Sequence, residues 1–242
     1  MSGLLEVMIH RMMLTNGLLK RAFHVGRRQL SCTMQLHCEF SICSSQQRKF
    51  NNCTAIYNHR SISTIVFLSI GKRILSLIAL SLNLDAEFFE NIGAFSCPSA
   101  FLRLLHYPGE VNESDDGNYG ASAHSDYGMI TLLATDGTPG LQICREKDRH
   151  PQYWEDVHHI DGALIVNIGD LLERWTNCIF RSTLHRVVAV GKERYSVAFF
   201  LDPNPNLVVQ CLESCCSVAC PPRFPPIKSG DYLKERLSVT YK

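Results

Sequence analysis

Residues 183–201 read TLHRVVAVGKERYSVAFFL, two runs of largely apolar and β-branched residues on either side of Gly191-Lys192. Valine, threonine and aromatic side chains favour strands, and a glycine-containing pair between two such runs is typical of a chain reversal. The stretch therefore predicts two strands, 183–190 and 195–201, joined by a short turn. If the neighbouring sequence also consists of short apolar runs separated by turn residues, an all-β core is expected.

Short apolar runs separated by turn residues continue toward the N-terminus as far as Pro98. Further strands are expected at 102–107, 129–135, 141–144, 153–160 and 163–168. The runs 129–135 and 141–144 are expected to pair as a hairpin, because Asp136-Gly137 and Pro139-Gly140 lie between them. Seven or so short strands with regular turns are typical of a sandwich, jelly roll or barrel.

Apolar residues at three- and four-residue spacing predict an amphipathic helix that starts near Gly71. This stripe consists of Ile74, Leu75, Leu77, Ile78 and Leu82. It is followed by Asp85, a suitable N-cap for a short second helix through Phe88 and Phe89.

Two more helices are expected within and after the strands. Asp170 and Glu173 have the spacing of a capping box, which would open a helix over 171–175. A C-terminal helix is expected from about Asp231 to Leu237, after a proline-rich stretch at 221–226 that should be extended.

Charge is divided unevenly along the chain. Residues 1–63 contain eight Lys or Arg and only two acidic residues, whereas 64–242 contain 16 basic and 21 acidic residues. The first 63 residues show no sustained periodicity, so a poorly ordered leader is expected there, with an organelle transit peptide or a basic interaction arm as alternatives. The total of +1 favours neither nucleic acid nor a membrane surface as a partner.

Eleven cysteines, an odd number, in a chain of this length indicate reduced thiols and a cytoplasmic protein. Four of them lie close together in the sequence, at 211, 215, 216 and 220, but without the paired spacing of a zinc ribbon.

The apolar stretch 65–84 is interrupted by Gly71, Lys72 and Arg73, so we expect it not to span a membrane.

The pattern His124-Ser125-Asp126 places an imidazole and a carboxylate two residues apart. On extended backbone, such side chains point to the same side and could reach one metal ion. His185, 59 residues later, would complete the two-histidine, one-carboxylate set that suits Fe(II) with open coordination positions. Taken singly, each residue has a simpler explanation: a surface pair, or a satisfied strand histidine.

Arg194 and Ser196 have the same two-residue spacing, nine residues after His185. A guanidinium offers a rigid, permanently charged fork for a carboxylate, and a hydroxyl adds one more donor. A dicarboxylate could therefore bind the metal at one end and Arg194 at the other. The simpler alternative for Arg194 is a surface ion pair with Glu193.

In this order, the motifs resemble the plant-type 2-oxoglutarate/Fe(II)-dependent dioxygenase superfamily, which also contains 1-aminocyclopropane-1-carboxylate oxidase. The resemblance covers roughly residues 71–232. The matching motifs are LRLLHYP at 102–108, GASAHSDYG at 120–128, PGLQ at 139–142, VNIGD at 166–170, STLHR at 182–186 and ERYS at 193–196.

The resemblance implies a double-stranded β-helix with flanking helices, Fe(II) held by His124, Asp126 and His185, and 2-oxoglutarate bound by Arg194, Ser196 and Tyr107. The implied reaction uses O₂ to oxidise a small organic metabolite, such as a plant specialised metabolite, and releases succinate and CO₂. Thr131, Leu133, Phe200 and the C-terminal segment are candidate substrate contacts. No nucleic acid or membrane partner is implied, and a monomer is expected.

Two departures from the family pattern leave alternatives open. Leu105 replaces an asparagine that many members have near the cosubstrate, and residues 1–63 do not resemble the family's N-terminal region. One alternative is a catalytically silent remnant with a binding or regulatory role. Another is an ascorbate-dependent enzyme like 1-aminocyclopropane-1-carboxylate oxidase.

The expected organisation of the chain is a leader (1–63), a helical segment (64–97), the oxygenase core (98–205) and a C-terminal extension (206–242).

Overall fold

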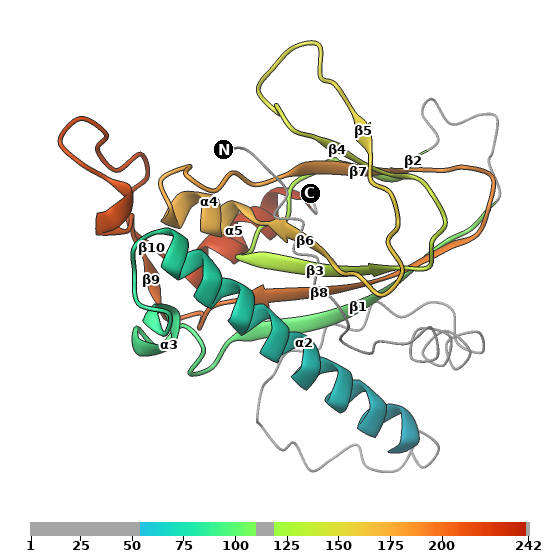
Figure 1. Ribbon diagram of the computed structural model, residues 1–242, viewed down its shortest axis with the longest axis horizontal. Coiled ribbons are helices and arrows are strands. Elements are labelled where there is room, and N and C mark those ends of the chain that lie inside the picture. Colours follow the sequence, from blue (N-terminus) through green and yellow to red (C-terminus); the bar gives the residue numbers. More distant parts are fainter. Residues whose placement is uncertain (1–53, 110–118, 241–242) are drawn as a thin grey trace.

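The computed structural model describes residues 54–109 and 119–240 of the chain, and its centre is a pair of four-stranded antiparallel sheets (Figure 1). The major sheet has the strand order β1 (Ser99–Tyr107), β8 (Arg194–Asp202), β3 (Ile130–Thr135) and β6 (Ile165–Ile168). The minor sheet has the order β2 (Tyr119–His124), β7 (Leu184–Val188), β4 (Leu141–Cys144) and β5 (Glu155–Asp156).

The chain passes repeatedly from one sheet to the other. It runs from β2 in the minor sheet to β3 in the major sheet, returns for β4 and β5, and then crosses to β6, to β7 and finally to β8. This alternation is that of a double-stranded β-helix, and it confirms the all-β jelly-roll prediction.

The predicted hairpin of 129–135 with 141–144 is wrong. Strand β3 pairs with β6 and β8, whereas β4 pairs with β5 and β7, so the two runs lie in different sheets. The turn residues do reverse the chain, with φ of +90° at Gly137 and +123° at Gly140. A turn fixes only where the chain bends, while the apolar faces buried between the sheets select the partners.

Each face of the major sheet packs against a different layer. Leu133 and Ala198 pack against Leu141 and Val187 of the minor sheet, so this side of the major sheet is its inner face. Because side chains alternate along a strand, Ile130, Leu132, Phe199 and Leu201 belong to the opposite, outer face and to the larger apolar core. Inner-face positions are the ones that can form a site between the sheets.

Helix α2 (Thr54–Ser81) lies along the outer face of the major sheet, where it contacts β1, β3 and β8 (Figure 1). It begins well before the predicted start near Gly71, because the apolar stripe continues backward through Ile70 and Phe67, both buried. Of the predicted stripe, Ile74, Leu75, Ile78 and Leu82 are buried, whereas Leu77 is exposed.

By length and composition alone, residues 64–81 of α2 would also qualify as a membrane-crossing helix, contrary to the expectation from Lys72 and Arg73. The structure gives its apolar side another partner. Phe67 stacks on Phe199 of β8, with 5.5 Å between ring centroids. A Cβ on Gly71 would lie 2.7 Å from the Leu201 side chain, so the helix packs closely on the sheet.

The remaining elements are short. They are α3 (Phe88–Asn91), α4 (Asp170–Trp175), α5 (Ser229–Thr240), the 3₁₀ turn η1 (Glu213–Cys215) and the strand pair β9 (Val208–Val209) with β10 (Ile227–Lys228). The helices predicted at 171–175 and 231–237 correspond to α4 and to the middle of α5. The predicted strand 153–160 is reduced to the two residues of β5.

Both predicted N-caps are wrong. Glu87 precedes α3, and Asp85 instead accepts a hydrogen bond from the Glu87 backbone N–H at 2.7 Å. Gly169 is the N-cap of α4, and Asp170 is its first residue. The Asp170 carboxylate is engaged by Ser125 and Arg236 instead, which explains why it does not cap its own helix.

The predicted division of the chain has one boundary inside a structural element. Residue 63 falls within α2, which begins at Thr54. The prediction of a poorly ordered leader concerns mainly residues 1–53, which lie outside the described residues.

Candidate metal centre

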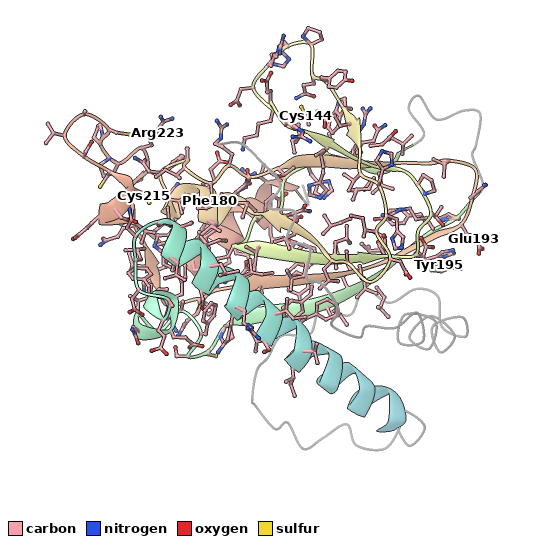
Figure 2. All side chains as sticks on the ribbon, in the orientation of Figure 1. Cys144, Phe180, Glu193, Tyr195, Cys215 and Arg223 are labelled. Atoms are coloured by element: carbon pink, nitrogen blue, oxygen red, sulfur yellow. The ribbon has the colours of Figure 1, made fainter. Side chains whose placement is uncertain are left out.

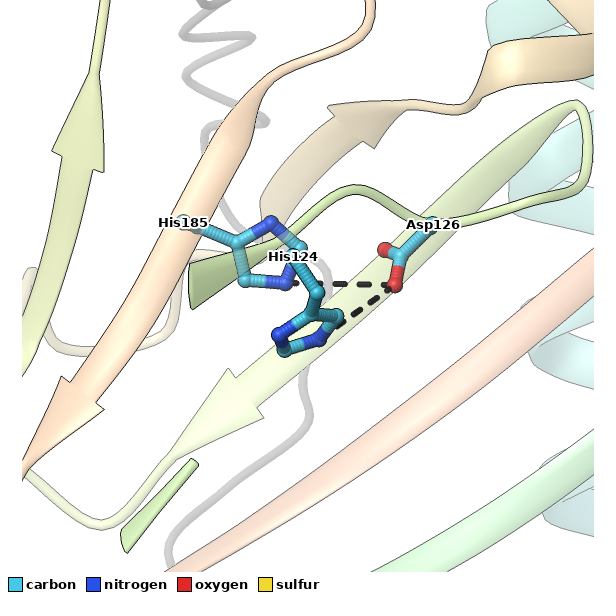
Figure 3. A group of neighbouring side chains, drawn as sticks. All are labelled: His124, Asp126 and His185. Atoms are coloured by element: carbon cyan, nitrogen blue, oxygen red, sulfur yellow. Dashed lines mark ion pairs between the residues drawn. The ribbon is translucent and has the colours of Figure 1, made fainter. Parts of the chain in front are cut away.

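Three side chains from the minor sheet and the loop after β2 meet on its inner side (Figure 3). His124 is the last residue of β2 and is paired directly with His185 of β7. Asp126 follows two residues after the end of β2 and is buried. We call His124, Asp126 and His185 the candidate metal centre, and they are the three residues that the sequence predicts as iron ligands.

The potential ligand atoms of the candidate metal centre face one another. The Asp126 Oδ1 atom lies 4.0 Å from Nε2 of His124 and 3.8 Å from Nε2 of His185. One ligand atom from each residue lies within 4.8 Å of the other two, and among the described residues this is the one group of histidine, cysteine and acidic side chains with that property. The separations are too long for direct hydrogen bonds.

Backbone carbonyls fix which ring nitrogens can bind a metal. Nδ1 of His124 lies 2.7 Å from the Ser122 carbonyl oxygen, and Nδ1 of His185 lies 3.0 Å from that of Thr183. A carbonyl oxygen only accepts, so each Nδ1 carries the proton and each Nε2 presents a lone pair. Three lone-pair donors therefore face each other without a proton between them, a set that fits a divalent cation.

Burial strengthens this fit. Asp126 Oδ2 is buried and has no hydrogen-bond partner in the described part of the chain, which is costly for a carboxylate without a counter-ion. Burial also lowers the pKa of His185, although the nearby Asp126 carboxylate opposes that shift. The imidazole is thus kept in the neutral form that a metal requires.

A second group of polar side chains lies on the inner face of the major sheet. Arg194 and Ser196 of β8 are both buried, and Arg194 Nη1 lies 3.4 Å from Ser196 Oγ. Tyr107 of β1 is paired directly with Arg194, and the guanidinium carbon lies 5.1 Å from the centroid of its ring. The structure thus brings together the three residues that the sequence predicts for 2-oxoglutarate.

Arg194 lacks the ion pair with Glu193 that was its simpler explanation. Glu193 instead accepts a hydrogen bond from the Tyr195 hydroxyl, at the exposed N-terminal end of β8 (Figure 2). Burial lowers the pKa of Arg194, but a guanidinium remains charged at any physiological pH. Its Nε has no hydrogen-bond partner among the described residues, so this buried cation could still pair with an anion.

Within residues 54–109 and 119–240, the other candidate ligands do not form a comparable site. The cysteines at 211, 215, 216 and 220 are free thiols, and Cys215 lies at the end of the molecule opposite Glu193 and Tyr195 (Figure 2). Nδ1 of His159 bonds to the Thr135 hydroxyl at 2.8 Å, and His158 is exposed.

Glu173 of α4 is a supporting residue that the sequence analysis assigned to a capping box. Its carboxylate accepts hydrogen bonds from Lys147 Nζ at 2.7 Å and from the Ser182 backbone N–H. Ser182 is three residues before His185, so the contact fixes the segment that leads into β7. Burial raises the pKa of Glu173, but the bonds from Lys147 and Ser182 outweigh this effect, and the pKa lies below its ordinary value.

We expect Glu173→Gln to lower the free energy of unfolding at pH 7 by roughly 1–3 kcal/mol, because an amide replaces a charged acceptor. A carboxylate with a lowered pKa contributes its full stability above its unfolded pKa of about 4.3, and loses it as the pH falls through the folded value. The difference between wild type and variant should therefore shrink below about pH 4. Urea denaturation across pH 3–7 measures it.

Glu146→Gln is the matched control, since Glu146 is exposed and bonds only to Arg149 in the described structure. It should change stability little at any pH. An equal loss in both variants, or a Glu173→Gln effect that persists undiminished at pH 3, would contradict the role given to Glu173.

Comparisons with known proteins all find similarity to 2-oxoglutarate-Fe(II) oxygenases. Residues 98–203 match the family model of the 2OG-Fe(II) oxygenase superfamily. Kihadalactone A synthase LFS of Citrus sinensis is 45% identical over 170 residues, which cover 70% of this chain and 51% of that protein. The 2-oxoglutarate-Fe(II) type oxidoreductase hxnY of Emericella nidulans is 37% identical over 174 residues, covering 71% of this chain and 48% of that protein.

A solved structure agrees with the fold. A full-length Neurospora crassa protein, crystallised in complex with alpha-KG, superposes with a TM-score of 0.69 at 30% identity. The match covers 78% of this chain and 63% of that one. The chain thus spans about half the length of the curated relatives it matches.

Proposed function

We propose that the chain is a member of the 2OG-Fe(II) oxygenase superfamily, whose family model its residues 98–203 match, and that it is an Fe(II)- and 2-oxoglutarate-dependent oxygenase of a small organic metabolite. The observation that carries the proposal is the candidate metal centre. Two imidazole lone pairs and one buried carboxylate oxygen face each other there, with both Nδ1 protons committed to backbone carbonyls.

His124, Asp126 and His185 would hold the iron from one side and leave the opposite positions for cosubstrate and O₂. The chemistry that iron and 2-oxoglutarate supply when bound is oxidative decarboxylation to succinate and CO₂, coupled to oxidation of the organic substrate. The protein's own contribution is to fix the ligand orientation and to bury the site. Asp126 and His185 are buried, whereas the His124 side chain is partly exposed to solvent.

Arg194, Ser196 and Tyr107 would bind the far carboxylate of 2-oxoglutarate. The guanidinium supplies the charge and a planar fork, and the serine and tyrosine hydroxyls supply further donors. Arg194 is buried and forms no ion pair in the described structure, although the Asp136 carboxylate lies near enough to attract it, so its guanidinium is available to an anionic ligand.

The inner face of the major sheet would also contact the organic substrate. Phe101 and Phe200 stack there with 4.6 Å between ring centroids, and Thr131 is paired directly with Phe200. Leu133 is the next inner-face residue of β3. These side chains favour an apolar, ring-containing molecule. The name of one relative, Kihadalactone A synthase LFS of Citrus sinensis, supports a small organic metabolite as the substrate.

Succinate release from the full chain, supplied with Fe(II), 2-oxoglutarate and ascorbate, tests the proposal. Pools of plant metabolites should contain one that raises the succinate yield in proportion to the substrate consumed. If oxidation requires ascorbate and gives no succinate, the enzyme is of the 1-aminocyclopropane-1-carboxylate oxidase kind. Tight binding of metal and 2-oxoglutarate with no turnover in any pool would favour the silent-remnant alternative.

We further propose a monomeric, cytoplasmic protein that works without nucleic acid or membrane. The seven described cysteines are free thiols, as in reducing compartments, and α2 packs its apolar side on the sheet. Light scattering on the purified chain, with and without liposomes, measures both the mass and any membrane binding.

A further inference from the structure

A guanidinium from the C-terminal helix reaches the loop that carries the candidate metal centre. Nη2 of Arg236, in α5, donates a hydrogen bond to Asp170 Oδ2 at 3.1 Å. The guanidinium carbon of Arg236 also lies 4.8 Å from the centroid of the Tyr127 ring. Tyr127 is the residue directly after Asp126. An element more than a hundred residues away in sequence therefore touches the metal-ligand loop.

Asp170 connects this contact to the loop from the other side. The same Oδ2 atom accepts a hydrogen bond from the Ser125 hydroxyl at 3.1 Å, and Ser125 lies between His124 and Asp126. The Asp170 backbone N–H donates to the Asp126 carbonyl oxygen at 2.7 Å. Asp170 thus holds two successive loop residues, one with its side chain and one with its backbone.

The first turn of α4 leaves the loop little freedom to move elsewhere. The Leu171 N–H donates to the Tyr127 carbonyl at 3.1 Å, and the Gly169 N–H donates to the Met129 carbonyl at 2.9 Å. A Cβ on Gly169 would lie only 2.1 Å from the Gly128 carbonyl oxygen. The backbone of the loop is therefore seated on α4, and the remaining freedom is mainly that of its side chains.

Helix α5 has its own anchors, so Arg236 reaches the loop from a fixed position. The N–H groups of Ser229 and Gly230 donate to the carbonyls of Leu207 and Pro205, each at 2.9 Å. Tyr232 packs against the larger apolar core, with the Arg174 guanidinium 5.7 Å from its ring centroid.

We propose that Arg236 is a positioning residue of the metal centre. Together with Asp170 it holds Ser125 and Tyr127, the two neighbours of Asp126, and so sets the direction of the Asp126 carboxylate. Its side chain is 42% exposed, so an ion pair of this kind contributes little to overall stability. Its contribution is instead to the orientation of a metal ligand, a role for which outer partners are known to matter about ten- to hundredfold in metal affinity.

The inference rests on the proposed function, and cobalt(II) binding tests the two separately. Co²⁺ is a spectroscopic substitute for Fe²⁺ whose visible absorption reports coordination geometry. In titrations of the full chain, we expect Arg236→Ala to weaken cobalt binding about tenfold. Arg236→Lys keeps the charge but loses the planar fork and the stacking on Tyr127, so it should fall between wild type and Arg236→Ala.

Lys234→Ala is the matched control, because Lys234 is an exposed cation on the same helix without a contact in the described structure. It should bind cobalt as wild type does. The melting temperatures of the metal-free variants should lie within a few degrees of one another. The titrations are run well below these temperatures, so that a general loss of structure does not explain weaker cobalt binding.

Asp170→Asn tests the same inference at the other partner of the Arg236–Asp170 ion pair. If Arg236 acts through Asp170, the double variant should weaken cobalt binding no more than the stronger single variant does. Wild-type affinity in Arg236→Ala, or fully multiplicative effects in the double variant, would overturn the inference while leaving the metal centre in place. If wild-type protein binds cobalt no better than His185→Ala does, the proposed function fails, and the positioning role fails with it.

Discussion

His185→Ala should lose divalent-metal binding by more than about a hundredfold, since loss of outer partners alone costs up to that factor. The change removes one of three ligands and leaves the buried Asp126 carboxylate beside a single imidazole. Turnover that depends on 2-oxoglutarate should disappear with the metal. Cobalt(II) titration followed by visible absorption measures the first effect, and succinate release measures the second.

His158→Ala is the control for this variant, because it removes an exposed histidine outside the metal centre. It should retain wild-type metal affinity. An equal loss in both histidine variants, or unchanged cobalt binding by His185→Ala, would mean that the three side chains do not share one ion.

Arg194→Ala should weaken 2-oxoglutarate binding and leave metal binding unchanged. A charge-assisted pair of this kind contributes on the order of 1.5–3 kcal/mol, which corresponds to a roughly ten- to hundredfold higher dissociation constant. Arg194→Lys should recover only part of the loss, because an ammonium lacks the planar fork that Ser196 and Tyr107 flank. Calorimetric titration of 2-oxoglutarate into the metal-loaded variants gives both values.

Arg186→Ala is the matched control for Arg194. Arg186 lies on β7, where its guanidinium bonds to Gln142 and lies over the Trp154 ring, on the side of the minor sheet away from the core. Its loss should leave 2-oxoglutarate affinity within about twofold of wild type. The assignment of Arg194 would be contradicted if its removal weakened metal and 2-oxoglutarate to the same degree.

The residues of the site could be predicted because their spacing reflects simple strand geometry. Side chains two apart on a strand share a face, and Arg194 and Ser196 are buried on one face of β8 as expected. The His124-x-Asp126 prediction used the same rule, although β2 ends at His124 and the loop, seated on α4, brings Asp126 into place. Their roles in binding iron and cosubstrate stay predictions until ligands are measured.

Features that depend on distant partners could not be predicted. The turn at Gly137 and Gly140 is visible in the sequence, but the assignment of β3 and β4 to different sheets follows from the apolar faces between the sheets. Asp170 has the spacing of a capping residue, yet its carboxylate is engaged by Ser125 and by Arg236, 66 positions later. No local pattern signals a contact of that kind.

The most direct test is the anaerobic addition of Fe(II) and then 2-oxoglutarate to the full chain, followed by visible absorption. A weak metal-to-ligand charge-transfer band should appear at one equivalent of each, should be absent in His185→Ala and should require more 2-oxoglutarate in Arg194→Ala. Folded, iron-loaded wild-type protein that develops no such band at saturating 2-oxoglutarate would contradict the account.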